Sequence, residues 1–296
     1  MKSVATIVVT FNRLRLLQEE VEALRNQSFG DHQIIVVNNG STDDTLEWLN
    51  EQEDVITITQ ENLGGAGGFY TGMKYAVEHN YKYCWIMDDD VICSPDALEQ
   101  LFKSFHAKKN IGFVCSNVFG VDGRPMNVPT VAQKEMDNGY PDFMDMIDKS
   151  MIRVSCATFV SVFLPTAVIS AVGLPYKEYF IWGDDTEYTE RISAEYPCYV
   201  SGLSKVVHKR SLQKGLDFLQ ETNPVRLNFY FYKIRNSGHR LKLKGMSLKR
   251  FYYDNIKLIV NLSFKRKWKH VGIVTKALIA VKGFNPKVIF AKALQT

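Results

Sequence analysis

The sequence contains little cysteine, and none of it is arranged in pairs. The chain of 296 residues has five cysteines and no CxxC motif. An odd number of scattered cysteines argues against a disulfide framework and favours a reducing compartment. We therefore expect a cytoplasmic protein.

Long hydrophobic runs are also absent. No segment reaches the roughly 18 uncharged apolar residues that a membrane-spanning helix needs. The chain enters an apolar segment after a single lysine, Lys2, without a basic leader before a long apolar stretch, so we expect no signal peptide. Hydrophobic residues make up 46% of the chain and aromatic residues 12%, which is enough for one large globular domain and an appendage.

Acidic residues are nearly missing from the last part of the chain. Residues 233–296 hold 16 lysines and arginines and one acid, Asp254, a net charge of +15, whereas the rest of the chain carries −11. Such segregation is typical of a basic surface for phosphate-rich partners. No nucleic-acid motif is present, so we do not expect nucleic acid to be the partner. We expect a catalytic domain over residues 1–222 and a basic, mainly helical region over 223–296.

The N-terminal part of the sequence alternates between predicted strands and helices. Its apolar runs are too uniform for half-exposed strands, and the segments between them have helical spacing. This alternation predicts an α/β fold with a mainly parallel sheet covered on both faces, whose binding residues lie at the carboxyl ends of the strands. The expected strands are Val4–Thr10, Gln33–Val37, Val55–Ile58 and Tyr83–Met87. Strand-like runs return at Arg153–Leu164, after a turn-rich excursion from Gly120 to Ser150 that could cover a substrate.

Four polar loops follow the four predicted strands and should converge on one edge of the sheet. They are Thr10–Arg13, Asn38–Asp43, Asn62–Gly68 and Asp88–Asp90. The third has four glycines within five residues before a helix, which would let backbone N–H groups approach an anionic ligand, although a flexible turn explains it as well. Its glycines lack the spacing and position of the dinucleotide-binding fingerprint.

The fourth loop contains three consecutive aspartates directly after a buried strand. Neighbouring carboxylates repel one another, so a divalent cation carrying a diphosphate is a natural partner. The alternative is an acidic turn that caps the helix expected near Ser94 and Pro95. A second acidic cluster, Asp184–Asp185, follows an aromatic run and could supply a general base, or cap a helix. His208 follows a short β run; a lone histidine is more often structural, but with the aspartates it could complete the ligands of a cation.

Together these motifs resemble the inverting family 2 glycosyltransferases of the GT-A fold. The resemblance covers about residues 3–210 and rests on the order and spacing of its motifs. They read Thr-Phe-Asn-Arg, Asn-Asn-Gly-Ser-Thr-Asp, Asn-x-Gly-Gly-Ala-Gly-Gly-Phe, Met-Asp-Asp-Asp-Val and Trp-Gly-Asp-Asp-Thr-Glu-Tyr, with a histidine downstream. The glycine and Trp-Gly-Asp-Asp motifs are most similar to those of bacterial galactofuranosyltransferases, and Phe231–Asn236 is similar to a segment of related rhamnosyltransferases.

The resemblance implies a role for each matching residue. It places Mn²⁺ or Mg²⁺ on Asp88, Asp90 and His208, and makes Asp185 the general base. It assigns the nucleotide sugar to Thr10, Phe11, Arg13, Asn39, Asn62, Gly64, Gly65, Asp88 and Asp89. Trp182 and Asp184 match positions on the acceptor side, though Trp182 could equally be a core residue. Many members carry Asp where this chain has Asn38 and Asn39; an amide can still hydrogen-bond a base without adding charge.

The C-terminal region combines cations with apolar side chains. Trp268 lies among the basic residues of Phe264–His270, and an apolar and basic stretch follows. This pattern suits an anionic membrane surface that carries a lipid-linked acceptor, so the protein could be peripheral at the inner face of the cell membrane. The alternative is a solvated basic face on a packing domain. The sequence leaves self-association open.

Three functions are compatible with these patterns to different degrees. The first is a metal-dependent inverting glycosyltransferase that extends a cell-surface polysaccharide or its lipid-linked precursor, with UDP-galactofuranose favoured over dTDP-rhamnose. The second is a non-catalytic nucleotide-sugar-binding protein, which predicts the loss of the base or of a metal ligand. The third is a nicotinamide-dependent enzyme, disfavoured by the position of the glycines and by the acidic strand ends.

Overall fold

Among the described residues, ten strands form one mixed sheet, and its first half has the predicted parallel topology. The computed structural model describes residues 2–210 and 217–294. Four parallel strands stand in the order β3-β2-β1-β4, and every residue of the central strand β1 is buried. Their bounds are Val4–Thr10 for β1, His32–Asn38 for β2, Val55–Thr59 for β3 and Tyr83–Asp88 for β4. In this register Thr10 is level with Asn38 and Val9 with Asp88, so the polar loops begin at one edge, as predicted.

The second half of the sheet is not parallel throughout. The strand β9 runs antiparallel to both β4 and β6, and β10 is parallel to β6 but antiparallel to β5 and β8. Here β8 and β9 follow one another without an intervening helix, so the alternation that favoured parallel pairing ends. The bounds are Val91–Cys93 for β5, Val114–Gly120 for β6, Thr130–Val131 for β7, Met151–Cys156 for β8, Val162–Pro165 for β9 and Tyr199–His208 for β10.

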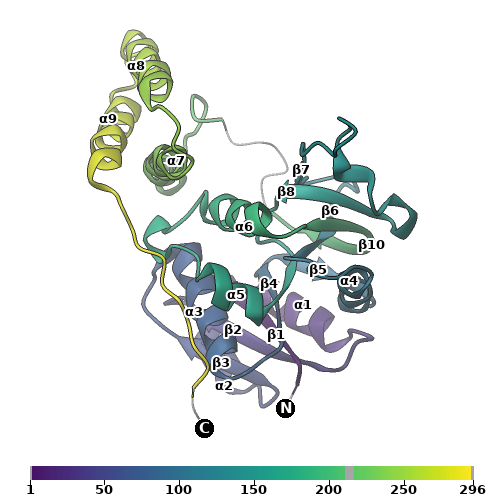
Figure 1. Cartoon of the computed structure of the whole chain (residues 1–296). Coiled ribbons are helices and arrows are strands. Elements are labelled where there is room, and N and C mark those ends of the chain that lie inside the picture. The colour runs from purple at the N-terminus through teal and green to yellow at the C-terminus, as the bar shows by residue number, and fades with distance from the viewer. Residues whose placement is uncertain (1, 211–216, 295–296) are drawn as a thin grey trace.

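Helices cover both faces of the sheet (Figure 1). One buried cluster joins the sheet to α3, α5 and α6 and contains Phe69, Ile169 and Ile192. A second joins the opposite face to α1 and α4 through Leu17 and Leu98. All five cysteines are free in this structure. The helices are α1 (Leu14–Arg25), α2 (Thr45–Asn50), α3 (Gly64–Glu78), α4 (Ala97–His106), α5 (Thr166–Val172) and α6 (Asp184–Glu195), with short 3-10 turns η1 (Asp142–Met144), η2 (Ile147–Lys149) and η3 (Lys177–Tyr179).

In the part of the chain that the structure describes, three further helices and an extended segment follow β10. They are α7 (Pro224–Leu243), α8 (Lys249–Phe264) and α9 (Trp268–Gly283). The start of α7 is capped by Asn223, whose side chain accepts hydrogen bonds from two backbone N–H groups, and Pro224 occupies the first turn, where no partner for its missing N–H is needed. In the described part of the chain, no helix has the length and apolarity to cross a bilayer.

Residues 284–294, the last described part of the region expected to be mainly helical, are not helical. This segment is extended and runs back along α5 and α3 (Figure 1). Leu174 N donates to Ile289 O at 2.8 Å, and Leu294 N donates to Glu78 O at 3.0 Å. Ala291 is buried in the cluster of α3, α5 and α6. Pro286, three residues after the end of α9, has no N–H to continue a helix.

Candidate active site

The four loops after β1, β2, β3 and β4 are joined by hydrogen bonds at one edge of the sheet. Thr10 Oγ1 donates to Asp89 Oδ2 at 2.8 Å, and Arg13 donates to Asp89 Oδ1 at 3.0 Å. The backbone N–H of Asn39 donates to Thr10 O at 2.9 Å. The predicted convergence of the loops is therefore confirmed. Asp89 is buried and both its oxygens bond to the loop after β1, so in this structure it holds that loop in place.

Two of the aspartates and the predicted histidine lie together. One ligand atom from each of Asp88, Asp90 and His208 lies within 4.8 Å of the other two. His208 Nε2 is 2.9 Å from Asp90 Oδ1, and Arg13 donates to Asp90 Oδ2 at 2.8 Å. The strand β10 brings His208 here by pairing with β5, so that His208 is level with Val91. Two carboxylates and one imidazole are a donor set that suits Mn²⁺ or Mg²⁺, so the residues fit a divalent cation.

The charges of this cluster are poorly compensated by the protein alone. Burial, with the neighbouring charge of Asp90, raises the pKa of Asp88 to about 7. Burial also raises the pKa of Asp89 to about 6, against the opposing charge of Arg13. For Asp90 burial is outweighed by the bond to His208 and by the charges of His208 and Arg13, so its pKa is lowered. A bound cation would relieve this repulsion.

Asn127 was missed by the sequence reasoning and contacts the cluster from the excursion after β6. Its Oδ1 lies 2.9 Å from His208 Nδ1. A hydrogen bond to Nδ1 fixes the ring and leaves Nε2 facing Asp90. Nothing in the local sequence marks Asn127, because the contact depends on how the excursion folds. The structure puts this residue beside the site, while η1 and β7 of the same excursion pack on β8.

We expect Asn127→Ala to weaken binding of Mn²⁺ by about 10-fold to 100-fold, the usual effect of losing such a supporting partner of a metal-binding histidine. Calorimetric titration with Mn²⁺ measures this directly. Asn138→Ala is the matched control, because Asn138 lies in the same excursion and its side chain accepts a hydrogen bond from Tyr140 N of its own turn. Equal affinities of the two variants and the wild type would contradict the role of Asn127.

The glycines of the third loop are part of a helix. The helix α3 begins at Gly64, so the expectation of a glycine loop before the helix is wrong. A Cβ on Gly68 would lie 2.3 Å from a methyl group of Val9, and one on Gly72 would lie 2.4 Å from Ile7. These glycines therefore let α3 lie close on β1. A Cβ on Gly65 would meet no described atom within 4 Å, so space is open beside the first turn.

Asn39 ties the second and third loops together. Its side-chain amide donates to Gly64 O at 2.9 Å and contacts Asn62 Oδ1 at 3.4 Å, while its Oδ1 accepts from Gln60 and Leu63. All its hydrogen-bonding positions are used inside the protein, so a contact with a nucleobase would require one of these bonds to break. The amide nitrogen of Asn38 is buried and has no partner among the described residues.

The second acidic cluster lies at the start of α6. Asp184 is buried, and this burial, together with the negative charge of Asp185, raises the pKa of Asp184 well above its usual range. The charge of Asp88 also raises this pKa, so the two acidic clusters interact electrostatically. Asp185 is partly exposed, and its Oδ1 accepts hydrogen bonds from Thr186 at 2.6 and 3.1 Å. Burial raises the pKa of Asp185 against these bonds and the charge of Arg240.

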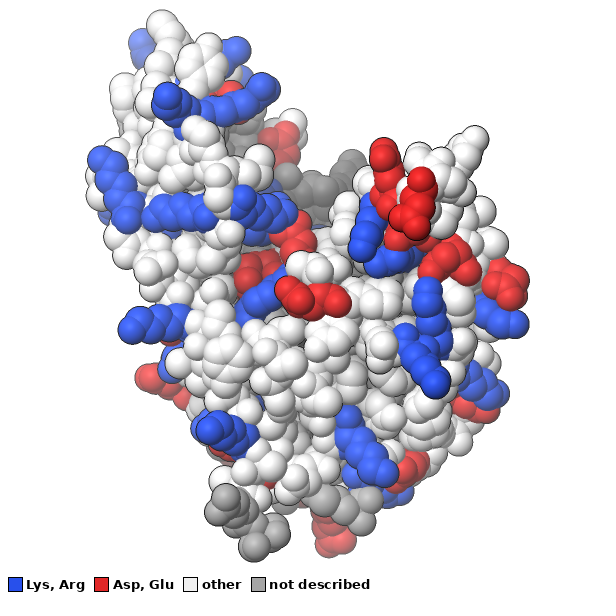
Figure 2. Space-filling model, viewed as in Figure 1, with Lys and Arg blue, Asp and Glu red and all other residues white. Residues whose placement is uncertain are grey.

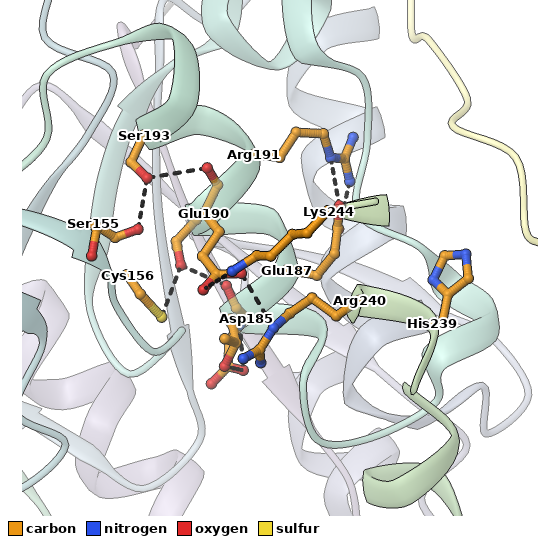
Figure 3. A network of polar contacts seen from close by, with 12 residues as sticks. Ser155, Cys156, Asp185, Glu187, Glu190, Arg191, Ser193, His239, Arg240 and Lys244 are labelled. Atoms are coloured by element: carbon orange, nitrogen blue, oxygen red, sulfur yellow. Dashed lines mark hydrogen bonds and ion pairs between the residues drawn. The ribbon is translucent and has the colours of Figure 1, made fainter. Parts of the chain in front are cut away.

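Arg240 reaches the second acidic cluster from α7, which the sequence reasoning had placed in a separate basic region. Figure 3 shows its side chain pointing toward Asp185 and Glu190. Arg240 and Lys244 pair with Glu190 at 3.2 and 2.9 Å. The aromatic ring of Trp182 meets the rings of Phe229 and Tyr230 edge-on, also on α7. The predicted acceptor side is thus lined in part by the C-terminal helices.

An open basin of about 710 Å³ lies beside the loop after β1. It is lined by Asn12, Arg13, Leu14, Arg15, Leu16, Glu19, Asp43, Val121 and Lys209. Phe11, predicted to flank a nucleobase, is 41% exposed at this edge of the sheet. The basin joins cationic side chains to the aspartate cluster through Arg13, so it has room and charge for an anionic ligand.

Comparisons with known proteins agree with this geometry. The family described as "Glycosyl transferase family 2" matches residues 5–160. A galactofuranosyltransferase, GlfT1 of Mycobacterium tuberculosis, is 25% identical over 211 residues, which are 64% of each chain. Poly-beta-1,6-N-acetyl-D-glucosamine synthase of Staphylococcus aureus is 23% identical over 68% of this chain and 47% of its own length. These matches span less than two thirds of the relatives.

A solved structure supports the fold assignment. The crystal structure of GalNAc-T7 with UDP, GalNAc and Mn²⁺ superposes with a TM-score of 0.59 at 14% identity, over 85% of this chain and 54% of that one. At this identity the likeness concerns the fold alone. It confirms the predicted α/β architecture with helices on both faces of the sheet.

Proposed function

Because the chain belongs to glycosyl transferase family 2 and is a glycosyltransferase, we propose that it moves a sugar from a UDP-sugar to a hydroxyl group in a metal-dependent, inverting reaction. One observation carries the proposal: Asp88, Asp90 and His208 meet at the strand ends, within the electrostatic reach of the Asp184–Asp185 turn. The cluster of Asp88, Asp90 and His208 has the composition of a metal site, and the Asp184–Asp185 turn supplies the general base.

The proposed mechanism gives the two acidic clusters separate roles. A divalent cation held by Asp88, Asp90 and His208 would supply Lewis-acid stabilisation to the diphosphate of the departing UDP. Arg13 adds a second positive charge at the same edge, where negative charge develops on the leaving group. Asp185 takes the proton from the acceptor hydroxyl group while the oxygen of that hydroxyl attacks the anomeric carbon from the face opposite UDP. A single displacement of this kind inverts the configuration at that carbon.

The donor and acceptor belong to the same proposal. We favour UDP-galactofuranose over dTDP-rhamnose, supported by the similarity to GlfT1 and by the glycine and Trp-Gly-Asp-Asp motifs. Asn62, Gly64 and Gly65 would lie along the sugar diphosphate, Phe11 would flank the uracil, and Trp182 and Asp184 would face the acceptor. We propose a glycan of the cell surface, or its lipid-linked precursor, as the acceptor. Retention of every candidate metal ligand and of the base disfavours a non-catalytic binding protein.

A screen of sugar nucleotides tests the proposed reaction. We expect UDP release in Mn²⁺ to be fastest with UDP-galactofuranose and to stop in excess chelator. Parallel reactions with dTDP-rhamnose, UDP-galactose and UDP-N-acetylglucosamine define the donor. Faster turnover of dTDP-rhamnose would overturn the choice of donor, and turnover in chelator would overturn the metal dependence.

The outer face of α8 supports a second part of the proposal, namely docking of the protein on an anionic membrane. The opposite face of α8 packs on α9. The outer face carries exposed apolar side chains three and four residues apart, followed by a tryptophan at the start of α9: Tyr253, Ile256, Val260, Phe264 and Trp268 are between 49% and 85% exposed. Figure 2 shows lysines and arginines gathered over the part formed by α7, α8 and α9. Apolar side chains flanked by cations suit a lipid surface, where they would hold a cytoplasmic enzyme next to a lipid-linked acceptor.

We expect the combined variant Lys257→Glu, Lys265→Glu and Lys269→Glu to bind anionic vesicles at least about 100-fold more weakly than the wild type. Each lysine near such a surface contributes about 1 kcal/mol. Lys267 is left intact because it donates to Leu219 O. Vesicle sedimentation at low and high salt measures the effect, since salt screens exposed charges.

A control with the same charge change separates docking from general repulsion. Lys109→Glu, Lys134→Glu and Lys149→Glu alter exposed lysines outside the C-terminal helices. This control should bind vesicles nearly as well as the wild type. Equal binding by all three proteins would mean that the α8 face does not bind lipid. The division into a catalytic domain, residues 1–222, and a basic, mainly helical region, residues 223–296, that associates with the membrane remains part of this proposal, with α7 of the second region also lining the acceptor side.

A further inference from the structure

The loop before Asp184 and Asp185 has a backbone that non-glycine residues adopt at a cost. Phe180 and Trp182 have φ angles of 63° and 62°, and Gly183 has a φ of 92°. For a residue with a side chain, the left-handed region costs on the order of 1–3 kcal/mol. Such a loop keeps its shape only where its surroundings hold it. The next two residues are the candidate acceptor residue and the candidate base.

The side chain of Asn236, on α7, contacts three backbone carbonyl groups of this loop. Its side-chain amide donates to Trp182 O at 2.8 Å and Tyr179 O at 3.0 Å, with Ile181 O at 3.3 Å. Asn236 is 1% exposed. Buried carbonyl groups need partners, and those of Ile181 and Trp182 lie outside any helix or strand. The two N–H groups of a single side-chain amide therefore serve the carbonyl groups of Tyr179 and Trp182, and the carbonyl of Ile181 lies within reach of the same nitrogen.

Arg235 fixes the side chain of Asn236. Its guanidinium donates to Asn236 Oδ1 at 2.9 Å and to Glu178 O at 2.6 Å. The bond to Oδ1 determines which end of the amide faces the loop, so that the NH₂ group points at the carbonyls. Arg235 itself lies over the ring of Phe284, 3.8 Å from its centroid, at the start of the extended C-terminal segment.

The same face of α7 also packs on the loop. Tyr232 stacks on Phe180 with ring centroids 4.8 Å apart. His239 Nδ1 lies 2.7 Å from the hydroxyl of Tyr179, and burial with the charges of Lys242 and Arg235 lowers its pKa to about 4, so that it can accept that hydrogen bond as a neutral ring. Residues 232, 235, 236 and 239 have the spacing of one helix face.

The other side of the loop touches α3, which carries the candidate donor-binding residues. Phe180 O accepts a hydrogen bond from Ala66 N at 3.1 Å. A Cβ on Gly64 would lie 2.1 Å from the same carbonyl oxygen, so a side chain there would push the loop away. The loop thus connects α7 to the first turn of α3 and to the first turn of α6.

We propose that Asn236, oriented by Arg235, is a positioning residue that sets the place of Asp185 relative to the sugar donor. The inference rests on the proposed function, because it takes Asp185 as the base. It also gives a function to the Phe231–Asn236 segment, which is similar to a segment of related rhamnosyltransferases. Through these residues the helix α7 completes the active site. Displacing a reacting group by about 1 Å lowers the rate about 10²-fold, so loss of the Asn236 hydrogen bonds should lower kcat.

Asn236→Asp tests the proposal with little change of shape. The aspartate keeps the oxygen that Arg235 binds but turns a second oxygen, instead of an NH₂ group, toward the loop carbonyls. We expect the kcat for UDP release from UDP-galactofuranose in Mn²⁺ to fall about 10²-fold. The Kd of UDP with Mn²⁺ should stay within about threefold of the wild type, because the strand-end loops are not altered. Deuterium uptake should rise in residues 178–186 and stay unchanged in residues 32–60.

Asn255→Asp is the matched control, since the Asn255 amide on α8 donates to Phe251 O of the same helix. It should leave kcat unchanged. Equal loss of kcat in the two variants, an unchanged kcat in Asn236→Asp, or deuterium uptake that rises throughout the chain would overturn the proposal and make Asn236 a folding contact. A wild type without turnover would overturn the proposed function instead, and uptake in residues 178–186 would still decide whether Asn236 holds the loop.

Discussion

Replacing Asp90 with alanine is expected to abolish sugar transfer while the fold persists. Asp90 contacts His208 through one oxygen and Arg13 through the other, at the point where a cation would be held. Lewis-acid stabilisation of a leaving group is worth several kcal/mol, so the loss should be on the order of 10³-fold or more. UDP release in Mn²⁺ measures the activity, and circular dichroism checks the fold.

Asp54→Ala is the matched control for this substitution. Asp54 is also an aspartate paired with an arginine, Arg25, but it lies at the opposite end of the strands and is exposed. Its loss should leave turnover unchanged. Full activity of the wild type in excess chelator, or an Asp90→Ala variant within tenfold of the wild type, would show that the cluster does not hold a catalytic cation.

The second large effect is expected from Asp185→Asn, which should lower kcat about 10²-fold to 10⁴-fold with little change in the affinity for UDP. The asparagine can keep the contacts that Oδ1 makes with Thr186 but cannot accept a proton. Burial raises the pKa of Asp185, which strengthens it as a base; below that pKa the protonated carboxyl cannot act, so wild-type activity should fall as the pH decreases. This acid limb should be lost in the variant.

Glu195→Gln, at the other end of α6, controls for the loss of a charge from the same helix. Rate and binding are measured separately, by UDP release and by calorimetry with UDP and Mn²⁺. A variant that loses UDP binding and retains its kcat would assign Asp185 to the donor site instead. A variant with the acid limb intact would mean that another group titrates.

The parts of the fold that follow local patterns could be predicted from the sequence. The uniformly apolar runs of β1, β2, β3 and β4 identify buried strands, and the polar residues after them identify the edge where the site lies. The pairing of β8, β9 and β10 could not be predicted, because it depends on contacts between segments far apart in the chain. Glycine composition alone also suggested a loop, whereas close packing of α3 on β1 explains Gly68 and Gly72.

Some residues of the candidate site could also be predicted from the sequence, and others could not. The carboxylates and His208 stand out by type and by position at strand ends, and the structure brings Asp88, Asp90 and His208 together as expected. Asn127, Arg240 and Asn236 reach the site from an irregular excursion and from α7. Their contacts require the excursion to fold back and the C-terminal helices to return to the sheet, which no local pattern encodes. The positive charge of residues 233–296 indicated an anionic partner, and nothing in that part of the sequence indicated that α7 contributes to the site.

The stereochemistry of transfer is the most direct measurement of the central claim, because a single displacement inverts the configuration at the anomeric carbon, whereas a double displacement through a covalent intermediate retains it. With UDP-galactofuranose, Mn²⁺ and an acceptor, NMR of the product reads the configuration at that carbon. We expect it to be opposite to that of the donor, and we expect at least about 10²-fold less product from Asp185→Asn in the same time. A product with the donor's configuration, or the same product yield from Asp185→Asn, would contradict the assignment of the strand-end site as an inverting active site with Asp185 as its base.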